Sequence, residues 1–415
     1  MDFNDTPEEA KFRAEARAWL EANAELRGPE DATGDALGEH VTEETIEQAQ
    51  VWQKKKADAG WACITWPKEY GGRGATSIQK VIWGQEEAKF ATPPAIFNIG
   101  IGMCGPTILT HGTEEQKKRW IPKMVSGEEI WCQLFSEPSA GSDLAGLRCS
   151  AVRDGDNWLL NGQKTWTTGA QFCEWGVIVV RTDPSAVKHA GLTYFVVNMR
   201  APGIEIRPIT QINGGQAFNE VFYSDTPVPD DQRISEVGNG WGVAITTLMN
   251  ERASIGGGGG AGVGLSDLFD MAMAMEVNGK PAVEDPVVRD TLADFYVRSK
   301  GLRYTGYRTL TALSRGTTPG PESSLGKLVG AFLAQEMGSF AVELQGISGA
   351  LDGPEHAAMD GVWQALYLGM PGLRIAGGTD EILRNIIAER VLRLPPEARV
   401  DKGIPFKDVP SGPPS

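Results

Sequence analysis

The spacing of apolar residues changes twice along this 415-residue chain, and that change limits the possible folds more than any other feature of the sequence. Residues 1–130 show helical spacing, whereas residues 131–236 contain short β-branched and aromatic runs separated by turn residues. Helical spacing returns in residues 237–395, and residues 396–415 are rich in proline. We therefore predict an α+β fold with an N-terminal helical domain, a middle β-barrel-like domain, a C-terminal four-helix-type domain and an irregular, partly mobile tail.

Local signals support this order. The segment PEEAKFRAEARAWLEANA places its apolar residues on one helical face, and a second helix is expected to begin after Thr42 and to end at Gly60. The segment DGDNWLLNGQKTW contains an Asp-Gly and an Asn-Gly pair between apolar runs, which is typical of β-hairpins. WGVIVVRT and LTYFVVNM are dense in strand-forming residues and predict two further strands.

The charge and the cysteine content exclude several classes of protein. A net charge of −15 argues against nucleic acid or an anionic membrane as the main partner. No apolar run has the length of a bilayer span, and the acidic start resembles neither a secretory signal nor a transit peptide. The five cysteines are widely spaced and the four histidines have no metal-ligand spacing. We expect a cytoplasmic protein with reduced thiols and no metal site.

Residues 134–170, LFSEPSAGSDLAGLRCSAVRDGDNWLLNGQKTWTTGA, carry the most specific motif of the chain. It is accompanied by WPKEYGGRGAT at 66–76, GTEEQKKRWIPKMVSGE at 112–128 and GGTDEILRNIIAERVL at 377–392. In this order, over roughly residues 1–395, the motifs resemble the acyl-CoA dehydrogenase family. The resemblance implies a tightly bound FAD and the α,β-dehydrogenation of an acyl-CoA thioester to a trans-2-enoyl-CoA.

Carried over residue by residue, the resemblance implies a set of cofactor contacts. Those expected in the middle domain are Phe135, Ser136, Gly141, Ser142, Trp166 and Thr168, and those expected in the C-terminal domain are Gln345, Gly349, Thr379 and Glu381. Ser142 is also expected to contact the substrate. The residue types suit these roles, because a Gly- and Ser-rich loop offers backbone N–H donors and an indole offers a flat apolar wall. Trp166 as a core side chain, and Thr379 as a simple helix cap, are the competing interpretations.

The reaction needs a carboxylate that removes the α-proton from the side opposite the flavin. Many family members place it directly before the GT turn, where this chain has Gly377. Another family pattern supplies the base from a helix as "ER", and Glu251 with Arg252 matches it. Glu251 lies on one helical face with Ala244, Leu248 and Ile255, where desolvation is expected to raise its pKa.

We therefore predict Glu251 as the base, Arg252 as a residue that organises or neutralises the site, and Met249 as a substrate contact. A surface glutamate paired with a basic residue is the competing interpretation of Glu251. Five glycines, Gly256–Gly260, follow it without the G-K-[ST] of a phosphate-binding loop. They are expected to clear space for the acyl chain or a packed helix, and a locally broken helix is the alternative.

Some family features are altered. No RxxFG motif is recognisable between Asn278 and Leu292, and the family's QxxGGxG segment keeps only Gln345 and Gly349. Such departures resemble bacterial members that assemble from two related subunits.

The resemblance implies an electron-transfer flavoprotein as acceptor and a homodimer or homotetramer, with a heterotetramer of related subunits as the alternative. A subunit that mainly completes a partner's site and a flavin monooxygenase on the same fold are the alternative functions. The shape of the acyl group, whether fatty, branched or ring-bearing, is left open by the sequence.

Overall fold

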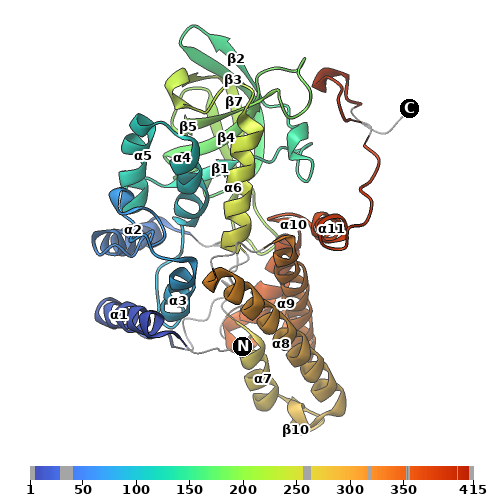
Figure 1. The fold of residues 1–415 in the computed structure, drawn as a ribbon. Helices are drawn as coiled ribbons and strands as arrows, with labels where there is room; N and C mark the ends of the chain where they lie inside the picture. Colours follow the sequence, from blue (N-terminus) through green and yellow to red (C-terminus); the bar gives the residue numbers. More distant parts are fainter. Residues whose placement is uncertain are drawn as a thin grey trace. The chain divides into compact units, whose positions relative to one another are not determined.

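The computed structural model describes residues 5–28, 41–255, 263–315, 320–351, 353, 356–399 and 401–410 (Figure 1). They form two compact units, each made from separate stretches of the chain. The helical unit comprises Met1–Glu39, Ala75–Thr92 and Ile255–Pro395, and the sheet unit comprises His40–Gly74, Pro93–Ser254 and Pro396–Ser415. Along the chain, helices are followed by strands and then by helices again, which confirms the predicted α+β class. The domain boundaries near residues 130, 236 and 395 stay predictions.

Two helices of the sheet unit begin after a threonine that caps them. Thr42 and Thr113 each accept a hydrogen bond from the backbone N–H three residues later, as the sequence predicts for Thr42. Gly60, with a φ of +74°, follows the first of these helices. The main helices of the unit are α2 (Glu43–Asp58), α4 (Gly105–His111), α5 (Glu114–Ser126) and α6 (Gly240–Ile255).

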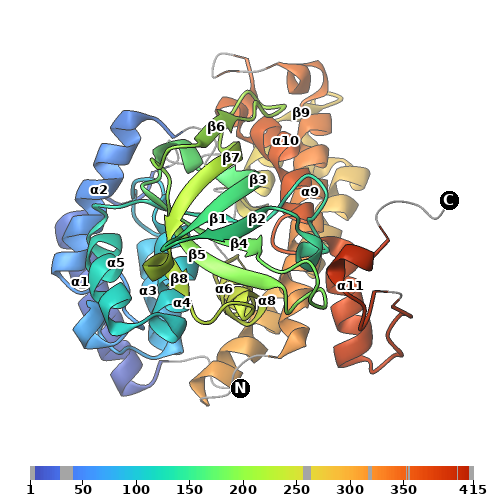
Figure 2. The ribbon, with the colours of Figure 1, turned by 90° about the horizontal axis from the view of Figure 1, so that it is seen from above.

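An eight-stranded sheet forms the centre of this unit, and Figure 2 shows its strands side by side. The strand order is β6-β7-β3-β2-β4-β5-β8, and β1 pairs with β4 in parallel. The strands are β1 (Trp131–Leu134), β2 (Ser150–Asp154), β3 (Asn157–Thr168), β4 (Trp175–Arg181), β5 (Leu192–Asn198), β6 (Ile204–Pro208), β7 (Phe218–Pro229) and β8 (Arg233–Ile234). The two strands predicted from WGVIVVRT and LTYFVVNM are β4 and β5.

Both faces of β4 and β5 are buried. Val177 and Val179 point into a core shared with α4, α5 and α6, whereas Ile178 and Val180 point into a second core shared with β2, β3 and β7. Alternate side chains of a strand face opposite sides of the sheet, so a strand covered on both sides is apolar at every position. This explains why the two predicted strands read as continuous apolar runs.

Of the Asp-Gly and Asn-Gly pairs that predict a hairpin, only the Asp-Gly pair lies in a turn between two strands. β2 and β3 pair across the Asp154–Asn157 turn, which contains the Asp-Gly pair. Gly162 of the Asn-Gly pair instead lies inside β3, at a register shift against β7. Its φ is +138°, and an added Cβ would lie 2.8 Å from the Cα atom of Cys149. The prediction of a turn there was wrong, because the glycine serves a β-bulge and a close backbone approach.

The helical unit packs around a core in which Trp363 and Leu268 are fully buried. Phe12, Ala16 and Leu20 form the buried face of the first helix, as the sequence predicts. Its main helices are α1 (Pro7–Asn23), α3 (Ser77–Glu87), α7 (Leu265–Ala274), α8 (Pro286–Ser314), α9 (Ser324–Leu344), α10 (Val362–Ile375) and α11 (Asp380–Ile386). Within the described part of the chain, no helix is both long and apolar enough to cross a bilayer.

Candidate active site

Helix α6 is fixed to the sheet unit through a buried hydroxyl network. The Thr247 hydroxyl lies 2.9 Å from the hydroxyl of Tyr194 on β5 and 2.9 Å from that of Thr107 on α4. Val243 and Ala244, one turn earlier, are fully buried in the core below. A helix anchored by both apolar packing and satisfied hydroxyls presents its next turn in a defined position.

Glu251 occupies that next turn, four residues after Thr247. It is half-buried, and its Oε2 atom accepts a hydrogen bond of 3.0 Å from the Nε2 atom of Gln133 on β1. The Oε1 atom of Gln133 is buried and has no hydrogen-bond partner among the described residues. The pair joins a helix and a strand that are 118 residues apart in the sequence. The expected rise in the pKa of Glu251 stays a prediction.

A buried ion pair holds the loop that follows β1. The Lys164 ammonium on β3 is fully buried and donates to Glu137 Oε1 at 2.8 Å and to the carbonyl of Phe135 at 3.0 Å. The Glu137 carboxylate also accepts backbone N–H groups of Arg148 and Cys149, at 2.7 and 2.9 Å. A buried carboxylate with three donors is well compensated, so this loop has a defined backbone.

The predicted loop residues lie close to this ion pair. Phe135 is buried, and its ring meets Tyr194 edge to face at a centroid distance of 6.0 Å. The Ser136 carbonyl accepts the Thr165 N–H at 2.9 Å, whereas Gly141 and Ser142 are exposed. A Cβ added to Gly141 would meet no atom within 4 Å. The loop backbone is therefore open at Gly141, whereas the start of the loop is held by the ion pair of Glu137 and Lys164.

Trp166 lies on a bulge near the end of β3. The register with β7 shifts between Lys164 and Thr167, and Trp166 has a φ of +60°. Its indole is 58% exposed and meets the Phe218 ring edge to face. A large non-glycine residue in this conformation is strained by about 1–3 kcal/mol, and such strain is concentrated at ligand sites. Thr168, half-buried, pairs with Phe218 at the strand end. The competing interpretation of Trp166 as a core side chain is wrong, because more than half of this residue is exposed.

The other residues predicted on α6 differ in their exposure and in how far the structure describes them. Met249 is 60% exposed, and Leu248 is partly buried against the core. The backbone of Arg252 and Ile255 belongs to α6, but their side chains lie outside the described residues. The glycine run Gly256–Gly260 also lies outside them, so its predicted role stays a prediction.

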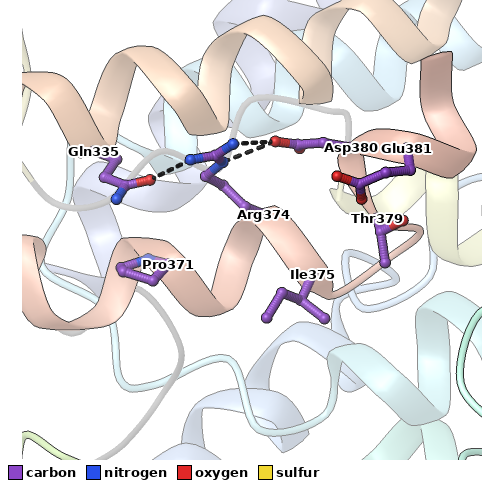
Figure 3. A pocket seen from close by; sticks show the side chains of 7 residues that line it. All are labelled: Gln335, Pro371, Arg374, Ile375, Thr379, Asp380 and Glu381. Atoms are coloured by element: carbon purple, nitrogen blue, oxygen red, sulfur yellow. Dashed lines mark hydrogen bonds and ion pairs between the residues drawn. The ribbon is translucent and has the colours of Figure 1, made fainter.

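Two further predicted residues line a pocket of about 260 Å³ in the helical unit (Figure 3). Thr379 caps α11 by accepting the Ile382 N–H, so the capping interpretation is confirmed. Hydrogen bonds from its own backbone N–H and from Thr379 lower the pKa of the exposed Glu381 carboxyl. Arg374 crosses the pocket wall and joins Gln335, at 3.0 Å, to Asp380, at 2.7 Å.

Gln345 and Gly349 are not in this pocket. They follow the end of α9, about 15 Å along the helix axis from Gln335, which lies near its middle. The Gln345 side chain donates to the Ala341 carbonyl and accepts the Ala358 N–H and the Gln364 amide. A Cβ at Gly349 would lie 2.2 Å from the Val342 carbonyl oxygen. Both residues thus have a structural role within the unit.

Within the sheet unit, the predicted base is bonded to Gln133 of β1, the strand that leads into the predicted flavin loop. Gln133 is the residue that sequence reasoning missed, although a polar residue in the apolar run WCQLF could have indicated a second role. The ion pair Glu137–Lys164 was also missed. Both residues lie inside the motif, but their pairing depends on strand register.

Three family models match the chain in order. The acyl-CoA dehydrogenase N-terminal domain matches residues 6–128, the middle domain matches 132–225 and the C-terminal domain matches 238–392. The chain belongs to the acyl-CoA dehydrogenase family. Members of this family are flavin-linked oxidoreductases, and the enzyme class predicted from the motifs is confirmed.

Similar acyl-CoA dehydrogenases cover almost the whole chain. Acyl-CoA dehydrogenase IpdE1 of Mycobacterium tuberculosis is 36% identical over 397 residues, which are 94% of this chain and 98% of the relative. The solved Tcur3481-Tcur3483 steroid ACAD is 28% identical with a TM-score of 0.81 and coverages of 96% and 100%. The ChsE4-ChsE5 complex of Mycobacterium tuberculosis is 27% identical with a TM-score of 0.76 and the same coverages.

The acyl-CoA dehydrogenase family depends on FAD, and the residues of the sheet unit fit such a group. Trp166 offers an exposed aromatic face, Gly141 offers open backbone, and Gln133 offers a buried Oε1 acceptor that no described residue pairs with. These three features suit a planar, hydrogen-bonding ligand.

Proposed function

We propose that this protein is an FAD-dependent acyl-CoA dehydrogenase in which Glu251 removes the α-proton of the substrate. The observation that carries the proposal is the hydrogen bond between Gln133 and Glu251. It holds a half-buried carboxylate beside the strand that leads into the flavin motif, two residues before Phe135. A general base needs both a fixed position and an ionised, acceptor-only carboxylate, and an amide donor favours both.

The chain's own residues would divide the work. Glu251 takes the proton from Cα of the thioester, and Gln133 orients the carboxylate. The chemistry that bound FAD would supply is the acceptance of the hydride from Cβ, so that two electrons and two hydrogens would leave the acyl chain in all. Trp166, Thr168 and the loop of Ser136, Gly141 and Ser142 are the proposed residues that hold FAD in the sheet unit. Thr379 and Glu381 of the helical unit stay proposed FAD contacts.

We propose a bulky, ring-bearing acyl group as the substrate class. One similar structure is named a steroid ACAD, and the base position on a helix is compatible with large acyl groups. Gly377 supports this choice, because no side chain stands where many family members carry their glutamate. Simple fatty acyl-CoAs are the alternative, and an electron-transfer flavoprotein is the proposed electron acceptor.

We also propose assembly with a related subunit as a second candidate. Two of the similar structures are each named for a pair of proteins, Tcur3481-Tcur3483 and ChsE4-ChsE5. Gln345 and Gly349 are the residues kept from one family motif. Both contact other residues of this chain: Gln345 accepts the Ala358 N–H, and Gly349 packs against the backbone of Val342. A homodimer or homotetramer is the other possible outcome. Light scattering of the purified chain, with its flavin content, distinguishes the two.

The experiment is anaerobic flavin bleaching by a panel of straight, branched and ring-bearing acyl-CoAs. Glu251→Gln is compared with Glu236→Gln, a control that removes a carboxylate that is 92% exposed in the same unit. We expect bleaching in the wild type and the control but not in a flavin-replete Glu251→Gln. Equal bleaching in all three would exclude Glu251 as the base.

A further inference from the structure

Two buried cations hold the loop that carries Gly141 and Ser142. Arg181 on β4 donates to the carbonyls of Ala145 and Leu147, at 2.7 and 3.3 Å. The Lys188 ammonium donates to the carboxylate of Asp143 at 2.7 Å. Arg181 and Lys188 are only 4% and 6% exposed, whereas the side chain of Asp143 is 64% exposed.

The C-terminal segment covers both cations from the other side. Phe406 is buried, and the guanidinium of Arg181 lies 3.5 Å from its ring centroid. Asp401 accepts from Lys188 at 2.7 Å and pairs with Arg399 at 3.1 Å. The backbone N–H groups of Phe406 and Lys407 donate to carbonyls of the loop that connects β4 to β5, each at 2.9 Å. Figure 1 shows this segment, in dark red, beside the sheet.

The contacts are those of an ordered segment. A cation stacked on an aromatic ring gains about 2 kcal/mol or more when desolvated, and an isolated buried ammonium would be strongly unfavourable without its carboxylates. Burial alone would lower the pKa of Lys188, but the hydrogen bonds from it to Asp143 and Asp401 outweigh burial and raise that pKa. Lys188 is therefore a charged bridge between two segments more than 200 residues apart.

We propose that Lys188 is a positioning residue for ligand binding, and that residues 401–408 form a latch that fixes the loop of Gly141 and Ser142 through it. This inference rests on the proposed function, which places FAD on that loop, and on the prediction that Ser142 also contacts the substrate. Asp143 directly follows Ser142, so any displacement of Asp143 moves the backbone that would contact the ligand. Asp401 contacts the loop through Lys188, and the ring of Phe406 packs against Arg181.

The test compares Lys188→Met, Lys188→Arg and Asp401→Asn in the full chain. The control is Lys407→Met, because Lys407 bonds to the loop between β4 and β5 through its backbone N–H, which the substitution keeps. Amide hydrogen exchange of residues 141–147 and the KM for the acyl-CoA are measured in each. We expect faster exchange and a KM raised roughly tenfold in Lys188→Met, with kcat changed much less. Lys188→Arg should restore both, and Asp401→Asn should give a smaller change in the same direction.

Exchange and KM equal to those of the control in both Lys188→Met and Asp401→Asn would overturn the latch. The hydrogen-exchange readout needs no activity, so it tests the latch even if no acyl-CoA bleaches the flavin. Bleaching in the wild type with unchanged exchange in the variants would reject the latch and leave the proposed function standing. Faster exchange in the variants together with an inactive wild type would support the latch and reject the proposed function.

Discussion

The amide of Gln133 on β1 donates to the carboxylate of Glu251 on α6 at 3.0 Å, and this bond joins the proposed flavin strand to the proposed base. Its neighbours explain why it forms. Thr247, one turn before Glu251, is fixed by buried hydroxyls, and Gln133 lies two residues before the buried Phe135. Both partners therefore come from positions that packing has already defined.

Replacing Gln133 should change the pH dependence of the reaction. A donated hydrogen bond favours the ionised carboxylate, so Gln133→Leu should move the acid limb of kcat/KM to higher pH. Gln133→Glu should move it further, because it places a like charge near Glu251. The measurement is a pH profile of kcat/KM. An acid limb at the wild-type pH in both variants would contradict the proposed role of Gln133.

The ion pair Glu137–Lys164 should make a large contribution to stability when one partner alone is removed. Lys164→Met leaves a buried carboxylate without its cation, which costs about 3–5 kcal/mol. The double variant Glu137→Gln/Lys164→Met should cost less than the two single variants added together. Urea unfolding gives the three values. Additive costs would show that the two side chains do not depend on each other.

Trp166 should affect flavin retention more than stability. Its indole is 58% exposed, so removing it loses chiefly the edge-to-face contact with Phe218, worth about 0.5–1.5 kcal/mol. Trp166→Gly should be more stable than Trp166→Ala by about 1 kcal/mol, because the residue has a φ of +60°. Both variants should lose flavin on gel filtration. Full flavin content in either would remove Trp166 from the proposed site.

Glu86 should govern acid stability of the helical unit. Its carboxylate is fully buried and contacts three cations: Arg13 at 3.0 Å, Arg17 at 2.9 Å and Lys89 at 2.9 Å. Burial alone would raise its pKa, but hydrogen bonds from the three cations outweigh burial and lower that pKa to about 2 from an ordinary 4.5. The stabilisation is thus complete above pH 4.5 and is lost as the pH falls towards 2.

Glu86→Gln should therefore lower the free energy of unfolding at pH 7 by an amount on the order of 2–3 kcal/mol. The difference in unfolding free energy between Glu86→Gln and the wild type should shrink below pH 4.5. Urea unfolding at several pH values measures this, with the exposed Glu8→Gln as a control in the same unit. A difference that stays constant from pH 7 to pH 3 would contradict the assignment.

The sequence predicted the elements better than the contacts between them. Apolar periodicity identified α1, the start and stop residues Thr42 and Gly60 identified α2, and dense strand-forming residues identified β4 and β5. The prediction of a turn at Gly162 was wrong, because a bulge and a hairpin both use glycine. The difference lies in what approaches the glycine from outside, here the backbone of Cys149.

The candidate site followed the same pattern. The motif residues Ser136, Gly141 and Trp166 could be named from the sequence, and the exposed indole and open loop suit their predicted roles. Gln133 could not be paired with Glu251, because strand and helix are 118 residues apart and no local pattern links them. Within the tail, which the sequence predicts to be irregular and partly mobile, residues 401–410 pack on the sheet unit through the buried Phe406. One aromatic residue in a proline-rich segment gives little signal.

The most direct test of the central claim is the rate constant of anaerobic flavin reduction in Glu251→Gln, measured by stopped flow with the acyl-CoA that bleaches the wild type fastest. Flavin content and substrate binding are matched to the wild type beforehand. We predict a fall of at least roughly 100-fold, the contribution of a positioned general base. Flavin reduction at the wild-type rate in the flavin-replete variant would show that the α-proton goes elsewhere and that Glu251 is not the base.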